Sequence, residues 1–215
     1  MVTVQLHQIR VPEGQTVELQ DVSWSKFEQI LQGLGNQRNT RIAYSNGVLS
    51  IVAPSPEHEA SKVSIGDFVK ILLDELNRNY VSLGSTTFKS DRMLKAVEPD
   101  DCFYITTYAQ VLGKSRISLE TDPPPELAIE IDVTSKTQLE AYKGLGVSEL
   151  WRYSNEKLRI DYLQNGEYIE VDQSPSFPKW LTRAAIERAV LSARQVGQGQ
   201  ARKEFRQWVL SQLTT

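Results

Sequence analysis

ELAIEIDV, residues 126–133, alternates large apolar residues with acidic or small ones. This period of two predicts a β-strand, because successive side chains of a strand point to opposite faces. One face would hold Leu127, Ile129, Ile131 and Val133, and the other would hold Ala128, Glu130 and Asp132. Two acids on one strand face repel each other unless a cation, a base or water lies between them. The strand is therefore either an edge strand whose acidic face is exposed to water, or a strand whose acids take part in a reaction.

Around this strand, the sequence alternates between helical and extended patterns. Helices are expected at residues 22–34, 57–78 and 136–145, and two more after Lys179. Short strands are expected within 80–105, and further strands at 157–163 and 167–172. The dipeptides Asn46-Gly47 and Asn165-Gly166 predict hairpin turns, because both residue types tolerate positive φ. We expect an α/β or α+β fold, in which helices flank a mixed sheet. Residues 1–178 would form a single domain, and 179–215 a C-terminal helical extension packed on or beside it.

Composition excludes several classes of protein. The chain has 215 residues, with 24 Lys and Arg against 27 Asp and Glu, so its formal charge is −3. One cysteine, Cys102, rules out an internal disulfide framework and a four-cysteine zinc site, and two histidines leave little room for a His-rich metal centre. No apolar run approaches the roughly 20 residues of a membrane span, and the N-terminus lacks signal-peptide features. These observations predict a soluble cytoplasmic protein without membrane contact.

Charge is distributed unevenly along the chain. From Lys179 onward the sequence has seven Lys or Arg and two Asp or Glu, a local charge of +5. The preceding residues then carry 17 − 25 = −8. The basic stretch is either a solvated helical face or a surface for a partner or a phosphate.

Three other acidic residues lie at or before the start of predicted helices and strands. Asp100 and Asp101 precede a predicted strand, and Glu59 lies in the first turn of a predicted helix. Taken singly, they are typical of turn residues and of helix starts, where acids are favoured. Together, Glu59, Asp100 and Glu130 could converge on a hard divalent cation such as Mg²⁺, which prefers oxygen ligands. Such an ion lowers the pKa of an attacking water and stabilises charge on a phosphate. This interpretation predicts a metal-dependent phosphodiesterase.

Five sequence blocks together resemble a known protein family. They are PSPEHEASK (Pro54 to Lys62), EPDD (Glu98 to Asp101), PELAIEIDVTS (Pro125 to Ser135), YKGLGVSELWRY (Tyr142 to Tyr153) and KLRIDYLQNGEYIE (Lys157 to Glu170). In this order they resemble the Uma-type restriction endonuclease family of the PD-(D/E)XK nuclease-like fold, over roughly residues 20–180.

The resemblance implies a restriction endonuclease-like core, a mixed sheet flanked by helices. It implies that Asp100, Glu130 and, on the preceding helix, Glu59 form the active site. The implied reaction is hydrolysis of a DNA phosphodiester with Mg²⁺ or Mn²⁺, which gives a nick or a double-strand break. A homodimer would be the simplest way to cut both strands.

The chain departs from the family pattern at one position. The pattern places a lysine two residues after the strand acid, and this chain has Asp132 there. Lys136 is the best candidate to supply the missing cation, followed by Lys143, while Gln138 could orient water as a neutral group. The predicted catalytic residues are thus Asp100, Glu130, Lys136 and Glu59. The predicted metal ligands are Asp100, Glu130, Glu59 and Asp132.

The missing lysine keeps two alternatives open. The chain could be a catalytically inactive nuclease-fold module that binds nucleic acid or protein, or it could hydrolyse a different phosphate ester. His58 is either a general base or a helix-cap or surface residue, while Trp151 and Cys102 are expected in the core. If Asp100 and Glu130 share one ion, their carboxylates should lie within about 6 Å of each other.

Overall fold

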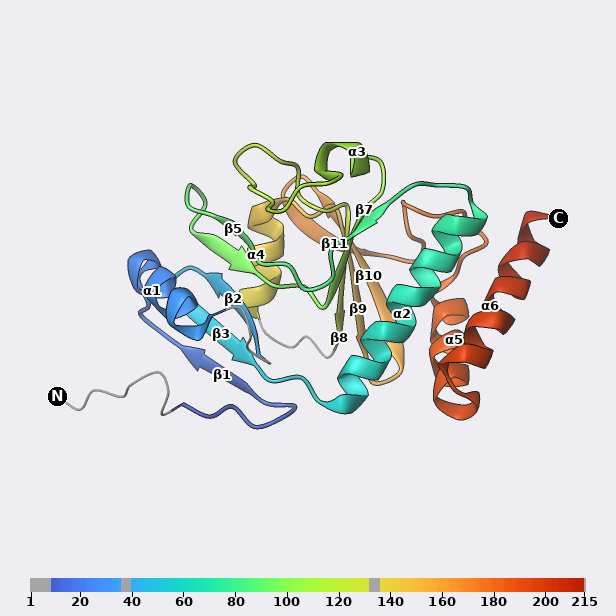
Figure 1. Cartoon of the computed structure of the whole chain (residues 1–215), viewed down its shortest axis with the longest axis horizontal. Coiled ribbons are helices and arrows are strands. Elements are labelled where there is room, and N and C mark those ends of the chain that lie inside the picture. The colour runs from blue at the N-terminus through green and yellow to red at the C-terminus, as the bar shows by residue number, and fades with distance from the viewer. Residues whose placement is uncertain (1–8, 36–39, 132–135, 215) are drawn as a thin grey trace.

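The computed structural model describes residues 9–35, 40–131 and 136–214, and it contains two β-sheets (Figure 1). The smaller sheet is antiparallel, in the order β1-β3-β2-β6-β5. Its strands are β1 (Thr16–Leu19), β2 (Arg41–Ser45), β3 (Val48–Val52), β5 (Phe88–Ser90) and β6 (Lys95–Val97). It lies to the left in Figure 1, beside α1.

The larger sheet has the order β11-β10-β9-β8-β7-β4 and is mixed. Its strands are β4 (Val81–Ser82), β7 (Asp101–Tyr104), β8 (Leu127–Ile131), β9 (Glu149–Ser154), β10 (Lys157–Gln164) and β11 (Glu167–Val171). Strands β8 and β9 are parallel, and the other neighbouring pairs are antiparallel. The expected fold class, a mixed sheet flanked by helices, is confirmed.

Six helices cover these sheets in the described part of the chain. They are α1 (Trp24–Leu34), α2 (Pro56–Glu75), α3 (Tyr108–Val111), α4 (Lys136–Leu145), α5 (Arg183–Val196) and α6 (Gln198–Leu213). Ser55 caps α2, since its side chain accepts a hydrogen bond from the backbone N–H of His58, and Pro56 opens the helix. No described helix is both long and apolar enough to cross a bilayer.

The apolar core is divided between the two faces of the larger sheet. Leu127, Ile129 and Ile131 of β8 pack with α2, α5 and α6 in one cluster. Ala128, on the opposite face, packs with α4, which also contacts β2 and β6 of the smaller sheet. Figure 1 shows α4 between the two sheets, and α5 and α6 beyond α2 at the right. Side chains of α5 and α6, including Ile186 and Phe205, belong to the same cluster as β8.

Several local predictions are confirmed. Both Asn-Gly hairpins form, with positive φ at Asn46 and Gly47 and at Asn165 and Gly166. The five predicted helices appear with boundaries shifted by a few residues. However, β8 lies inside the larger sheet and both of its faces are buried, so the edge-strand interpretation with a wet face is wrong. The division into two sheets, with β1 and α3, was not predicted.

Candidate functional site

Asp100 and Glu130 meet where β7 and β8 run side by side. The two strands are antiparallel, with Asp101 opposite Ile129, so Asp100 lies next to Glu130. The backbone N–H of Asp100 donates to the Ile129 carbonyl over 3.2 Å. The Ile131 N–H in turn donates to Asp100 Oδ2 over 2.8 Å. These backbone contacts fix Asp100, whose carboxyl shares a hydrogen bond with that of Glu130.

The two carboxyls are almost completely removed from water. Asp100 is 2% exposed and Glu130 is 3% exposed. Burial raises the pKa of Glu130 well above its usual value, and the adjacent Asp100 charge raises it further. A hydrogen bond from Tyr142 and the charge of Arg41 act in the opposite direction without reversing the shift. The protonated form of Glu130 is therefore favoured while no cation lies beside the pair.

Tyr142 is a member of the site that sequence reasoning missed. It lies on α4, and its hydroxyl donates a hydrogen bond to Glu130 Oε1. Its ring is fully buried, and burial together with the Glu130 charge raises the pKa of Tyr142 well above its usual value. Gln138, one turn earlier on α4, is also buried. The spacing of four residues, which places both on one helix face, was the available signal.

His58 reaches the site from the first turn of α2. Its Nε2 lies 3.0 Å from Asp100 Oδ2, and its Nδ1 lies 3.8 Å from Glu59 Oε1. The side chain is buried, so the interpretation of His58 as a surface residue is wrong. With His58 on one side and Glu130 on the other, Asp100 joins α2 to the strand acid.

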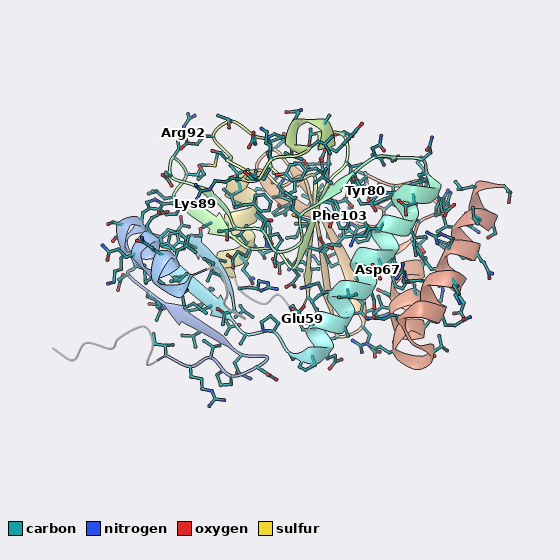
Figure 2. All side chains as sticks on the ribbon, viewed as in Figure 1. Glu59, Asp67, Tyr80, Lys89, Arg92 and Phe103 are labelled. Atoms are coloured by element: carbon teal, nitrogen blue, oxygen red, sulfur yellow. The ribbon has the colours of Figure 1, made fainter. Side chains whose placement is uncertain are left out.

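Glu59 lies at the lower end of α2 in Figure 2, and its side chain is 40% exposed. Its Oε2 pairs with Lys62 Nζ at 2.7 Å, and its Oε1 lies 3.8 Å from an Arg41 terminal nitrogen. Burial alone would raise the pKa of Glu59, but Lys62 and then Arg41 outweigh it, so the pKa is lowered. Its ion-pair partners in the described part of the chain are Lys62, Arg41 and His58, and they include neither Asp100 nor Glu130.

The other expected site residues contribute less to this arrangement. Asp132 lies outside the described residues, as does the side chain of Lys136, whose backbone begins α4. Lys143 pairs instead with Glu140 at 2.8 Å and with Glu167 at 3.2 Å. Cys102 and Trp151 lie in the core, as expected.

The donor chemistry of the carboxyl pair fits a hard divalent cation. The donors from Ile131 and His58 both use Oδ2 of Asp100, and Tyr142 uses Oε1 of Glu130. Each carboxyl keeps a second oxygen that these donors do not use, and Mg²⁺ in proteins is commonly held by one or two carboxylates plus water. Within the described ranges, no group of three or more His, Cys, Asp or Glu side chains is placed to hold a metal ion. The fit therefore depends on the Asp100–Glu130 pair.

Comparisons with known proteins identify a family and a shared fold. A family model described as "Uma2: Putative restriction endonuclease" matches residues 24–192. Among solved structures, the chain is similar to a crystal structure described as "a putative nuclease belonging to DUF820" from Anabaena variabilis ATCC 29413. The TM-score is 0.52 at 14% identity, over 79% of this chain and 99% of that chain. A likeness at this identity shows a shared fold. No curated protein matches the sequence.

Proposed function

The chain belongs to the Uma2 restriction endonuclease family, and from this premise we propose that it is a metal-dependent DNA endonuclease whose metal site is the Asp100–Glu130 pair. The family match supports a nuclease-type enzyme. The observation that supports the finer proposal is a pair of buried, mutually hydrogen-bonded carboxyls from adjacent strands. Two buried acids, one with a strongly raised pKa, are costly for folding, and such groups cluster at functional sites.

The residues around the pair have separate roles in this proposal. Asp100 and Glu130 would hold Mg²⁺ or Mn²⁺, which when bound lowers the pKa of a water and offsets phosphate charge. Tyr142 orients the Glu130 carboxyl by donating to Oε1, and the Ile131 N–H orients Asp100 through Oδ2. His58 holds the same Asp100 oxygen from the α2 side. The buried apolar surroundings of Ala128 and Leu150 exclude water from the sheet side of the pair.

Relaxation of supercoiled plasmid tests the proposal. Wild type should nick plasmid with Mg²⁺ or Mn²⁺ and lose this activity in EDTA. Glu130→Gln, which keeps the shape of the side chain, should lower cleavage at least about 100-fold. Asp101→Asn is the matched control, because Asp101 is a buried neighbouring acid that contacts Ser82 and the Cys102 N–H. It should stay within a few fold of wild type. Cleavage by Glu130→Gln at the wild-type rate would contradict the assignment of the pair.

A second candidate function follows from Asp132, which stands where the family pattern has lysine. It is a catalytically inactive nuclease-fold module that binds nucleic acid or protein. The same experiment separates the two candidates. If folded wild type binds DNA but leaves plasmid uncut with Mg²⁺ and with Mn²⁺, the inactive module is the better description.

A further inference from the structure

A groove of about 650 Å³ lies between the chain leading into β1, the start of β2 and the first turn of α2. Its walls include Arg10, Thr40, Arg41, Ser55 and Glu59. A volume of this size is typical of sites for small ligands, and is sufficient for a nucleotide unit. Glu59, one of its lining residues, marks the position of the groove at the lower end of α2 in Figure 2.

Arg41 has hydrogen-bonding capacity that its described neighbours do not use. Its side chain is 18% exposed, and its Nε is buried without a hydrogen-bond acceptor among the described residues. Glu59 Oε1 lies 3.8 Å from a terminal nitrogen of Arg41, which is beyond hydrogen-bond distance. Glu59 is instead bound by Lys62 at 2.7 Å. An arginine has five N–H donors in a planar fork that matches phosphate oxygens.

The same side chain connects the groove with the carboxyl pair. Arg41 and His58 Nδ1 both lie 3.8 Å from Glu59 Oε1, and His58 Nε2 lies 3.0 Å from Asp100 Oδ2, so His58 links the groove wall to the pair. In agreement, the Arg41 charge lowers the pKa of Glu130. Arg41 comes from the smaller sheet, whereas Asp100 and Glu130 belong to the larger one. The positive charge of Arg41 therefore comes from the smaller sheet, and not from the residues that follow Glu130 in the sequence.

The charges around the groove also permit an anion. Arg10 and Arg41 line it together with Glu13 and Glu59. The charge of Glu59 is offset by Lys62, which lies in contact with it. The two arginines and two glutamates of the lining therefore balance in formal charge, and Lys62 beside Glu59 adds one positive charge.

We propose that this groove binds a backbone phosphate of nucleic acid, and that Arg41 is the residue that contacts it. The proposal deepens the endonuclease function and rests on it for the identity of the substrate. The phosphate would lie next to Asp100 and Glu130, so Arg41 would supply the positive charge that the family pattern obtains from lysine and that Asp132 does not provide. Arg10 would contact the next part of the same strand.

The test measures binding without cleavage. A fluorescein-labelled single-stranded DNA is titrated with protein in EDTA, and fluorescence anisotropy gives Kd at several salt concentrations. Arg41→Gln should weaken binding about tenfold and should reduce the slope of log Kd against log salt by about 0.7, the value for one lost phosphate contact on a single strand. Arg41→Lys keeps the charge and should bind within about threefold of wild type.

Arg206→Gln is the matched control for the loss of one positive charge. Arg206 lies on α6, at the opposite end of the molecule from β2 (Figure 1), and pairs with Glu75 at 2.7 Å. It should change Kd less than twofold. Equal weakening by Arg41→Gln and Arg206→Gln, with both variants folded by circular dichroism, would overturn the proposal. Failure of wild type to bind the DNA would overturn it as well.

Two further outcomes keep the inference separate from the proposed function. Inorganic phosphate at matched ionic strength should not displace the DNA, and displacement at equal phosphate concentration would show a free-phosphate site instead. Wild type that binds DNA through Arg41 but does not cut plasmid would refute the endonuclease function and leave the groove assignment intact.

Discussion

The two ends of β8 carry acids with opposite surroundings. Glu126 immediately precedes the strand and accepts hydrogen bonds from the backbone N–H groups of Ile105, Thr106 and Thr107, at 2.7, 2.9 and 2.8 Å. The Thr106 hydroxyl donates to it as well. Glu130, near the other end, faces Asp100 and receives a hydrogen bond from Tyr142. One acid is surrounded by donors, and the other is placed against a second acid.

This difference in partners reverses the effect on the pKa. For Glu126, burial alone would raise the pKa, but the hydrogen bonds outweigh burial and the pKa lies below its usual value. For Glu130, burial and Asp100 both raise the pKa, and Tyr142 only moderates the shift. Glu126 therefore stabilises the fold as a carboxylate, while Glu130 destabilises it. An acid that costs stability in this way is typical of a site retained for a ligand.

The largest effect on stability is expected at Glu126, whose carboxylate accepts several hydrogen bonds. Glu126→Gln should lower the free energy of unfolding by about 2–3 kcal/mol, because the loop N–H groups lose charge-assisted bonds and the amide cannot accept them all. Urea unfolding at neutral pH measures this change. Glu120→Gln, at an exposed acid nearby, should stay within about 0.5 kcal/mol of wild type. A loss no greater than that of the control would mean that the loop does not depend on Glu126.

A smaller effect on stability, of opposite sign, is expected at Glu130, which lies against Asp100. Glu130→Gln should raise the free energy of unfolding by about 1–2 kcal/mol in EDTA at neutral pH, because a neutral amide accepts from Tyr142 and donates to Asp100 without the cost of protonating a carboxyl. Cleavage should be lost in the same variant. Urea unfolding of the two variants side by side gives the comparison directly. Destabilisation by Glu130→Gln would show that the acid pair is part of the fold's support and is not strained.

The alternation of β8 could be predicted from the sequence, but the surroundings of Glu126 and Glu130 could not. Period-two alternation correctly separated Ile129 from Ala128 and Glu130, because strand geometry is local. The Asn-Gly hairpins were equally local. The burial of Glu130 depends on α4, whose Tyr142 packs on that strand face, and the partners of Glu126 lie in a loop after β7. Such contacts between distant segments leave no periodic signal in a single sequence.

The same limit applies to the site itself. Asp100 and Glu130 could be predicted because a strand acid and an acid before a neighbouring strand occupy corresponding positions at a sheet. Tyr142, His58 and Arg41 approach from α4, α2 and β2, so their contributions depend on how three separate elements pack around the pair. Glu59 resembled a converging ligand in the sequence, yet Lys62, one helical turn later, provides a local partner for it.

A third effect, of about 1 kcal/mol, is expected from Tyr142→Phe. The change removes the hydroxyl that donates to Glu130, so the buried acid loses this hydrogen bond while the ring remains packed. Urea unfolding should show a modest loss in the wild-type background. In the Glu130→Gln background the loss should be smaller, because a neutral amide needs the hydroxyl less. Equal losses in both backgrounds would mean that Tyr142 acts through packing alone.

A dependence on pH distinguishes the two ends most directly. Both acids have an ordinary pKa of 4.5. Glu126 has a lowered pKa in the folded state, so its stabilisation is complete above pH 4.5 and is lost as the pH falls below 4.5 through the folded value. Glu130 has a raised pKa, so its penalty is absent below pH 4.5 and grows as the pH rises from 4.5 through the folded value.

Unfolding of wild type, Glu126→Gln and Glu130→Gln in EDTA, from about pH 3 to about pH 8, therefore resolves two windows. The deficit of Glu126→Gln should shrink only below pH 4.5, and the advantage of Glu130→Gln should grow only above it. Because the windows lie on opposite sides of one value, a general effect of acid on the protein cannot produce both. If the Glu130→Gln advantage changed on the acid side instead, Glu130 would be charged and stabilised in the folded protein, and the two ends of β8 would be alike.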